Sequence, residues 1–192
     1  MNLLIMFAKN PEKEKVKTRL AQKIGEEKAK RIYKHLLCKN ICIHSRAAYD
    51  FMIYAQGDLD YFSNVKAKKQ MGTDLGERML NSFKEELQYY DRVVLVGSDL
   101  NLENTLVERA FEQLEKCDVV IGPANDGGYY LIGMKKADDV FGNVRWSTST
   151  VFEETVQKMK DNDLTYVTLP ERRDIDTIED LKYYKEKLSL DL

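Results

Sequence analysis

Short apolar runs alternate with amphipathic segments along almost the whole chain, and no other feature constrains the fold as strongly. The apolar runs lie at residues 2–8, 51–55, 93–96, 119–121, 129–133 and 167–169. Between them, apolar residues recur at helical spacing in residues 25–44, 75–90, 103–116, 149–160 and 178–188. Strands that alternate with helices of this length indicate a mostly parallel sheet with helices on both faces.

The predicted fold is therefore a three-layer α/β domain with a mostly parallel, Rossmann-like sheet. The 192 residues suit a single domain, residues 1–192, and a hydrophobic fraction of 43% is enough for a buried core. Open sheets of this kind bind ligands at the carboxyl ends of their strands, where the strand order reverses. The loops that follow the apolar runs are thus the first places to look for chemistry.

Charge and apolar length exclude two classes of partner. The formal net charge is −2, from 30 basic and 32 acidic residues, whereas a nucleic-acid-binding domain is usually strongly basic. No apolar stretch approaches the roughly 20 residues that span a bilayer. The apolar start, Met1–Ala8, is too short for a signal peptide, so we expect a cytoplasmic protein with neither a membrane nor a nucleic-acid partner.

Three cysteines, an odd and low number, argue against a disulfide framework and suit a reducing compartment. On a helix, His35, Cys38 and Cys42 would lie near one face, with His44 close by, and this suggests zinc. The spacing matches no standard zinc signature, and Leu36 and Leu37 share the segment. A core helix is the favoured interpretation.

The loop after the first apolar run is rich in cations. It follows Ala8 and contains Lys9, Lys15, Lys17 and Arg19. Several cations and loop amides at a strand end suit the charge of a nucleotide's phosphates. The alternative is a solvated run of charges, since the loop has neither the Walker-type glycines nor a G-x-G-x-x-G pattern.

Gly97-Ser98-Asp99 follows the clearest apolar run, Val93–Val96. A carboxylate that emerges from an apolar strand at the ligand-binding edge is costly to desolvate unless it is paired or holds a metal. Asp99 is therefore a candidate metal ligand, and Ser98 a candidate phosphate contact. The alternative is a turn or helix cap, a common role of aspartate.

The segment from Gly122 to Tyr130 contains Asp126, Gly127 and Gly128. Paired glycines let the backbone approach a ligand closely, so Gly127 and Gly128 are candidates for substrate binding. Asp126 could grip or deprotonate a substrate hydroxyl and is the candidate catalytic residue. The alternative is a plain hairpin turn, for which Asp-Gly is a strong signal.

Asp174 and Asp176 alternate, so in an extended segment both would point to one side. Two carboxylates there could ligate Mg²⁺ or Mn²⁺. The alternative is that Asp176 or Thr177 caps the last helix. Trp146, the only tryptophan, could stack on a base or sugar or lie in the core, and the helix start at residues 71–78 could hold an anion.

Together these loops resemble one bacterial family. The motifs are Lys-Thr-Arg-Leu, Asp-Leu-Gly-Glu-Arg-Met, Gly-Ser-Asp, Gly-Pro-Ala-x-Asp-Gly-Gly-Tyr-Tyr-Leu-Ile-Gly, Trp-Ser-Thr and Asp-Ile-Asp-Thr-x-Glu-Asp-Leu, and they cover the chain from Leu4 to Leu181. The chain is similar to the GT-A-type glycosyltransferases formerly called DUF2064, which are associated in some genomes with arsenosugar biosynthesis and radical-SAM neighbours. One departure is that Leu100 and Asn101 follow Asp99, where the family usually has a proline at the second position.

The resemblance implies a nucleotide-diphospho-sugar transferase fold. It also implies that the first loop contacts the nucleotide, that Asp99 binds the metal, and that Asp174 and Asp176 lie across the same cleft. The leading hypothesis is glycosyl transfer from a nucleotide-sugar, with Mg²⁺ or Mn²⁺ on the diphosphate and a small-molecule acceptor.

Two other functions stay open at the level of the sequence. The first is nucleotidyl transfer, in which a nucleoside triphosphate reacts with a phosphorylated small molecule and releases pyrophosphate. The second is a non-catalytic nucleotide-binding protein. A homodimer is also open, because Tyr89 and Tyr90, or Tyr183 and Tyr184, could lie either on a free surface or at an interface.

Overall fold

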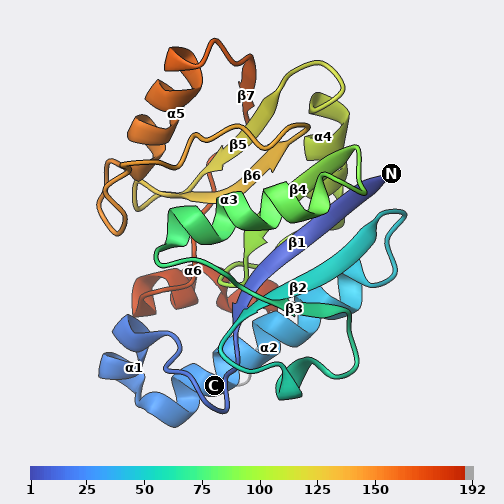
Figure 1. Ribbon diagram of the computed structural model, residues 1–192. Helices are drawn as coiled ribbons and strands as arrows, with labels where there is room; N and C mark the ends of the chain where they lie inside the picture. The colour runs from blue at the N-terminus through green and yellow to red at the C-terminus, as the bar shows by residue number, and fades with distance from the viewer. Residues whose placement is uncertain (189–192) are drawn as a thin grey trace.

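The structure, a computed structural model, describes residues 1–188 and has strands and helices in alternation (Figure 1). The strands are β1 (Asn2–Lys9), β2 (Asp50–Gln56), β3 (Ala67–Lys69), β4 (Arg92–Gly97), β5 (Val119–Pro123), β6 (Tyr129–Met134) and β7 (Tyr166–Thr168). The helices are α1 (Thr18–Ile24), α2 (Glu26–His44), η1 (Asp60–Phe62, a 3₁₀ turn), α3 (Leu75–Glu86), α4 (Asn104–Gln113), α5 (Val151–Asp161) and α6 (Ile178–Leu188).

The strands described form one sheet in the order β3-β2-β1-β4-β6-β5-β7. Strand β6 runs antiparallel to both of its neighbours, β4 and β5, and the other neighbouring pairs are parallel. The predicted three-layer fold with a mostly parallel sheet is thus confirmed. The antiparallel strand arises because the short loop between β5 and β6 makes a hairpin instead of a helical crossover.

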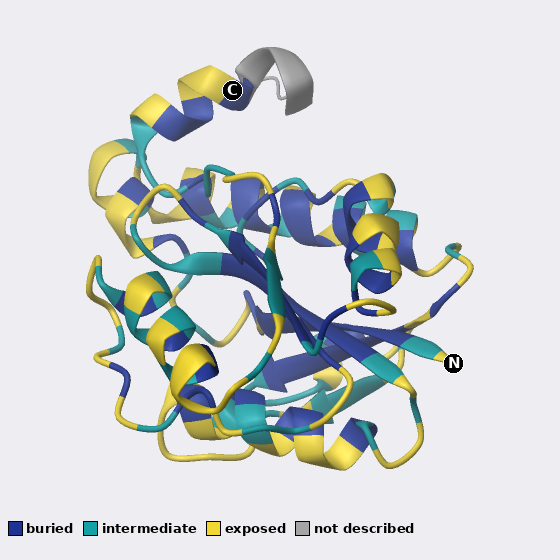
Figure 2. Cartoon of the chain, turned by 90° about the horizontal axis from the view of Figure 1, so that it is seen from above, coloured by how far each residue is buried: buried dark blue, intermediate teal, exposed yellow. Residues whose placement is uncertain are grey.

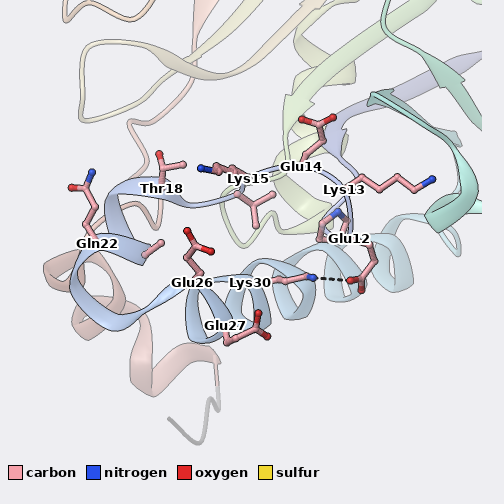
Figure 3. Close-up of a pocket in the computed structure, with 12 residues that line it drawn as sticks. Glu12, Lys13, Glu14, Lys15, Thr18, Gln22, Glu26, Glu27 and Lys30 are labelled. Atoms are coloured by element: carbon pink, nitrogen blue, oxygen red, sulfur yellow. Dashed lines mark ion pairs between the residues drawn. The ribbon is translucent and has the colours of Figure 1, made fainter.

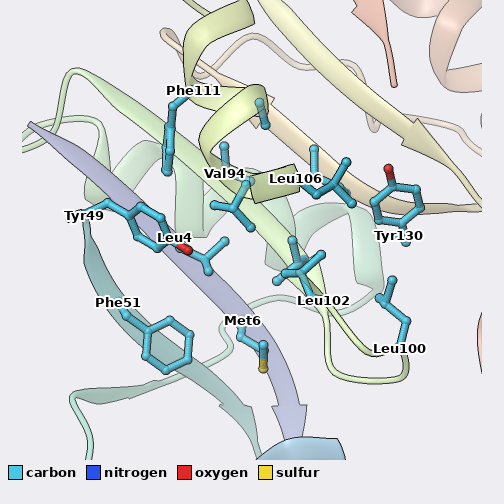
Figure 4. Close-up of a cluster of buried hydrophobic side chains, with 14 of the residues drawn as sticks. Leu4, Met6, Tyr49, Phe51, Val94, Leu100, Leu102, Leu106, Phe111 and Tyr130 are labelled. Atoms are coloured by element: carbon cyan, nitrogen blue, oxygen red, sulfur yellow. The ribbon is translucent and has the colours of Figure 1, made fainter. Parts of the chain in front are cut away.

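Side chains along β1 point alternately to the two faces of the sheet, so they divide the core between these faces. Leu4, Met6 and Ala8 of β1 pack with side chains of α2 and α4, in a cluster that Figure 4 shows in part. Leu3, Ile5 and Phe7 face the opposite way and pack with α3 and α5. Because helices cover both faces, β1 is buried on both, as the dark blue strands in Figure 2 show.

The strand order reverses beside β1. The chain passes from β1 to β2 and β3 on one side, and then returns through α3 to β4 on the other side of β1. Two parallel neighbours that are connected in opposite directions leave a crevice at their carboxyl ends. The loops after β1 and β4, which contain Lys17 and Asp99, therefore start at this crevice.

A third apolar cluster joins the two ends of the chain. Leu20 of α1 and Ile32 of α2 pack with Ile175 and with Leu181 of α6. Ile175 lies between Asp174 and Asp176, and its burial fixes the segment that carries these two carboxylates next to the first loop.

Most expected elements occur within two to four residues of their predicted ends, and the structure adds three more. Helix α1, strand β3 and the η1 turn were not predicted, because they are short and lack a clear apolar period. Helices α3 and α4 end earlier than expected, at Glu86 and Gln113. Within residues 1–188, no helix combines the length and the apolar character that a bilayer crossing requires.

Candidate functional site

Lys17 joins the loops after β1 and β4 to the segment before α6. Its Nζ lies 2.6 Å from Oδ1 of Asp99 and 3.1 Å from Oδ1 of Asp176. It also donates a 3.2 Å hydrogen bond to the Asp99 carbonyl oxygen. The Lys17 side chain is 1% exposed, whereas those of Asp99 and Asp176 are 46% and 34% exposed. Residues far apart in the sequence thus meet at one ammonium group.

The charge on Lys17 is maintained by these partners. Burial opposes the charged form, but attraction to Asp99 and Asp176 outweighs it, so the pKa of Lys17 lies above its ordinary value. The backbone at Lys17 is left-handed, with φ 50° and ψ 45°, and begins helix α1. A non-glycine residue keeps this conformation only when its surroundings hold it, and here the three contacts of Nζ do so.

Asp174 lies near the other carboxylates, and its contacts differ from theirs. Its Oδ1 is buried and accepts no hydrogen bond from the described residues. Burial, and then the nearby charge of Asp99, raise the pKa of Asp174 to about 7, with smaller contributions from Asp176 and Asp126 in the same direction. The four aspartates that the sequence singled out therefore share one electrostatic environment, with Lys17 as the opposing charge.

Ser98 is held beneath this cluster. Its side chain is buried, and its hydroxyl lies 3.0 Å from the hydroxyl of Tyr33 in α2. The same Tyr33 hydroxyl accepts a 2.9 Å hydrogen bond from the backbone N–H of Lys9. Tyr33 thus connects the end of β1 with the loop after β4, and the Ser98 hydroxyl is the group that it contacts in that loop.

Two adjacent cavities open on either side of Asp99. One, of about 320 Å³, is lined by Ala8, Lys9, Lys17, Ser98 and residues of the sheet edge next to β2. The other, of about 610 Å³, extends over the sheet face that carries α3 and is lined in part by Arg19, Asp126, Gly128, Trp146 and Asp176. Phe7, Leu75, Gly97 and Asp99 line both. We call them the β2-side cavity and the α3-side cavity.

The loop at Asp126 is a hairpin and also a wall of the α3-side cavity. It connects the antiparallel strands β5 and β6, as the alternative interpretation expected. Asp126 is exposed, and its Oδ1 accepts a 3.0 Å hydrogen bond from the N–H of Gly128. Asp126 and Gly128 both line the cavity, so the hairpin presents a carboxylate to it.

Gly127 has a structural role in this loop. Its φ is +89°, and a Cβ there would lie 2.1 Å from the carbonyl oxygen of Ser149. Its own carbonyl accepts a 2.9 Å hydrogen bond from the N–H of Phe152. Gly127 therefore faces the start of α5, whereas Gly128 faces the cavity.

Trp146 is half-buried and lines the α3-side cavity. Its ring meets that of Tyr129 edge-on, with centroids 6.5 Å apart and an interplanar angle of 73°. Helix α3 approaches it closely at Gly76, where a Cβ would lie 2.9 Å from the indole. One part of Trp146 thus packs in the core and another part faces the cavity, while stacking on a base or sugar stays a prediction.

The cations of the first loop do not all converge. Lys15 lines a separate cavity of about 520 Å³ between this loop and helices α1 and α2 (Figure 3). Lys13 pairs with Asp58 and Asp60, and Glu12 pairs with Lys30 and Lys34. Of the predicted phosphate-binding lysines, Lys9 and Lys17 reach the cavities at Asp99, and Lys15 does not line them.

Two smaller expectations concern helix starts. At the start of α3, Asp74 accepts a 2.8 Å hydrogen bond from the N–H of Glu77, so a carboxylate of the chain caps this terminus. Thr177 caps α6, because its hydroxyl accepts from the N–H of Asp180 while Asp180 accepts from the N–H of Thr177.

The core interpretation of helix α2 is confirmed. Leu36 and Leu37 are buried, whereas Cys38 and Cys42 are exposed. His44 lies on the buried side with its Nδ1 2.6 Å from the Tyr49 hydroxyl. In residues 1–188, no group of three or more histidine, cysteine, aspartate or glutamate side chains is arranged as a ready metal site.

The sequence interpretation missed several residues of the β2-side cavity. Gln56, Gln70 and Arg78 line it, and Gln70 Nε2 donates a 2.8 Å hydrogen bond to the Tyr54 carbonyl oxygen. Arg78 belongs to the Asp-Leu-Gly-Glu-Arg-Met motif, so this motif could have identified it as a site residue. Gln56 is the last residue of β2 and Gln70 follows β3, and the rule that ligands bind at strand ends would have found them.

Comparison with known proteins agrees with this geometry. The family model described as "Uncharacterized protein conserved in bacteria (DUF2064)" matches residues 35–148. A crystal structure from Desulfovibrio desulfuricans, described as a "putative nucleotide-diphospho-sugar transferase", is 38% identical and superposes with a TM-score of 0.91, covering 97% of this chain and 87% of that one. The chain belongs to the DUF2064 family.

More distant structures share the fold of this DUF2064 protein. The 4-diphosphocytidyl-2C-methyl-D-erythritol synthase of Anaerococcus prevotii is 10% identical, with a TM-score of 0.63 and coverage of 98% of this chain and 96% of that one. A cytidylyltransferase from Leptospira borgpetersenii is 13% identical, with a TM-score of 0.58 and coverage of 100% and 87%. No curated protein sequence matches the chain.

The predicted superfamily and enzyme class are thereby confirmed. The DUF2064 protein is a transferase of the nucleotide-diphospho-sugar transferase superfamily.

Proposed function

We propose that this DUF2064 protein transfers a glycosyl group from a nucleotide-diphospho-sugar to a hydroxyl of a small molecule. One observation carries the proposal: the half-exposed Asp99 lies at the junction of two cavities, at the point where the strand order reverses. A donor has two parts, a nucleotide and a sugar, that meet at a diphosphate. Two cavities that meet at a carboxylate suit such a molecule.

The β2-side cavity is the proposed nucleotide site. Lys9 and Arg78 line it, and cationic side chains with backbone amides at a strand end suit phosphate oxygens. Arg19 lines the other cavity beside Asp99, and it makes no ion pair within the described residues. Its guanidinium is available to offset charge on the leaving diphosphate.

Asp99 and Asp176 are the proposed holders of a divalent ion, Mg²⁺ or Mn²⁺. The donor set fits: both are half-exposed carboxylates that share a cation already, and the buried Oδ1 of Asp174 accepts no hydrogen bond from the described residues. Magnesium is commonly bound by one or two carboxylates together with substrate phosphates. When bound, such an ion supplies Lewis-acid stabilisation of the diphosphate that leaves. In the structure, Lys17 is the cation that these two carboxylates share.

Asp126 is the proposed residue that orients and deprotonates the acceptor hydroxyl. It lines the α3-side cavity together with Asp99, and among residues 1–188 only one of its carboxylate oxygens accepts a hydrogen bond, from the N–H of Gly128. The other oxygen is accessible for a hydrogen bond to an acceptor. Neither histidine lines either cavity, so a carboxylate is the best available base.

The arrangement of the first-loop cations favours glycosyl over nucleotidyl transfer. A triphosphate requires more opposing charge than a diphosphate, but Lys13 pairs with Asp58 and Lys15 lines a separate cavity. Lys17 in turn is engaged by two carboxylates. The cationic loop therefore gives less support to a triphosphate site than its composition implied.

Product analysis tests the proposal. The protein is incubated with Mn²⁺, a panel of nucleotide-sugars or of nucleoside triphosphates with sugar phosphates, and a mixture of acceptors. Release of a free nucleoside diphosphate that depends on Asp99 and on an added acceptor supports glycosyl transfer. Release of pyrophosphate instead supports nucleotidyl transfer. Nucleotide binding without turnover of any donor would support the non-catalytic alternative.

A further inference from the structure

The α3-side cavity has two chemically different ends. Three of its charged lining residues, Asp99, Asp126 and Asp176, come from loops at the carboxyl edge of the sheet, and Arg19 comes from the first turn of α1. The other end lies on the sheet, where Phe7 of β1 and Leu95 of β4 are lining residues. Met79 of α3, Tyr129 and Trp146 line it as well. The polar groups at which the transfer is proposed are thus continuous with an apolar chamber.

The chamber is held open by rigid parts. Gly76 lets α3 contact the edge of Trp146, since a Cβ there would lie 2.9 Å from the indole and 3.2 Å from Cβ of Phe141. Tyr129 holds the other side of the ring edge-on. An aromatic ring fixed on two sides, with its remaining surface in a cavity, is a platform on which a flat ring can stack.

Hydrogen-bonding groups are concentrated at the charged end of the cavity and on the rim of the chamber, where Ser147, Thr148 and Ser149 are lining residues. Of the hydroxyl residues on its rim, Thr148 already donates a 2.8 Å hydrogen bond to the Arg145 carbonyl oxygen. The Tyr129 hydroxyl has the Met79 sulfur at 3.9 Å as its hydrogen-bond partner. A free sugar carries hydroxyls around its whole ring, and those that faced Phe7, Leu95 and Met79 would lack partners, which is costly.

We infer that the acceptor is an alcohol or phenol with a flat, apolar body, which lies between Met79 and Trp146 with its hydroxyl towards Asp126. This inference rests on the proposed function. In the transfer, the acceptor oxygen forms a bond to the anomeric carbon while the bond from that carbon to the diphosphate oxygen breaks. The nucleoside diphosphate leaves with the electron pair, and the acceptor proton passes to the Asp126 carboxylate.

The single tryptophan allows a direct binding test. Trp146 fluorescence is titrated with 2-naphthylmethanol and, as the matched polar probe, with methyl glucoside, in the absence of donor. We expect saturable quenching by the aryl alcohol, with a Kd at least about tenfold below that of the glucoside, because apolar area is removed from water. Equal or tighter binding of the glucoside would overturn the inference.

Variants show where the probe binds. Met79→Gln keeps the length of a buried side chain, and Leu75→Gln changes one that is 43% exposed, so the second variant remains informative if the first does not fold. Each should raise the Kd of the aryl alcohol about fivefold or more. The control is Met71→Gln, at a side chain that is 65% exposed and outside the cavity lining. Equal Kd values for Leu75→Gln and the control would contradict the inference.

Failure of this inference can be told apart from failure of the proposed function. Thermal stabilisation by Mn²⁺ with nucleoside diphosphates reports on the Asp99 region and does not require an acceptor. If that stabilisation occurs and the aryl alcohol does not bind, the acceptor class is wrong and the proposed donor site stands. If the aryl alcohol binds and no nucleotide does, the apolar chamber is real but the proposed function is wrong.

Discussion

Replacement of Asp174 by asparagine is expected to change how stability depends on pH. The Asp174 carboxyl has a pKa of about 7 in the folded protein, against an ordinary value of 3.8, because it is buried beside Asp99 and Asp176. Between these two values the folded state binds a proton that the unfolded state does not. Stability must therefore fall as pH rises from about 4 to 7. The asparagine side chain would resemble the protonated carboxyl at every pH, so the variant would lack this loss.

The size of the effect follows from the two pKa values. Each pKa unit corresponds to about 1.4 kcal/mol, so raising the pH from 5 to 8 costs the wild-type protein roughly 2.6 kcal/mol through this one carboxyl. Asp174→Asn should gain about that amount relative to wild type over the same interval. For a chain of this length, the gain corresponds to a relative rise in Tm on the order of 5–10 °C.

Urea denaturation at pH 5, 6, 7 and 8 gives the measurement. Groups other than residue 174 titrate in both proteins, so they cancel in the difference between Asp174→Asn and wild type. Asp161→Asn removes one exposed negative charge at the end of α5 and serves as the control. A difference between Asp174→Asn and wild type that does not change with pH, or that shrinks as pH rises, would refute the reasoning.

Three further substitutions test separate parts of the site. Gly127→Ala should lower the free energy of unfolding by about 3 kcal/mol, because its Cβ would combine a left-handed φ with a clash at Ser149. The control Gly25→Ala has φ +88° and no atom near its Cβ, so it should show only the smaller loss due to the left-handed backbone. Equal losses for the two variants in urea denaturation would contradict this. Gly97→Val should abolish the stabilisation by nucleotide in a thermal-shift assay, because residue 97 lines both cavities. The Tm without nucleotide should fall little, because a Cβ at this position meets nothing within 4 Å. Unchanged stabilisation by nucleotide would be the contrary result. Lys17→Met should raise the affinity for Mn²⁺ about tenfold in the absence of nucleotide, because the Lys17 ammonium competes with the ion for the carboxylates of Asp99 and Asp176. Electron paramagnetic resonance measures this affinity, and Lys15→Met is the control. Equal affinities of the two variants would contradict the competition.

The sheet could be predicted from the sequence because burial on both faces makes its strands continuous apolar runs. Val93–Val96 and Leu3–Phe7 are examples, and both form strands where expected. The antiparallel direction of β6 was not predicted. It depends on the hairpin at Asp126, which the sequence offered only as the alternative to a ligand-binding loop.

The candidate site was predicted in part. Asp99, Asp126 and Asp176 follow separate strands, and the carboxyl edge of the sheet brings all three to one cavity. The contact of Lys17 with two of them could not be predicted, since it depends on a left-handed backbone at a lysine and on burial of Ile175 against α1 and α2. Lys15 was predicted to join the phosphate site with Lys17, but the two lysines line different cavities although they are only two positions apart.

Binding of nucleoside diphosphates in the presence and absence of Mn²⁺ tests the central proposal most directly. Isothermal titration of the wild-type protein, Asp99→Asn and the control Asp161→Asn with UDP, GDP, ADP and CDP measures it. We expect at least one of the four to bind more tightly with Mn²⁺, and we expect this gain to disappear in Asp99→Asn and to persist in Asp161→Asn. A gain of the same size in Asp99→Asn would contradict the assignment of Asp99 to the ion.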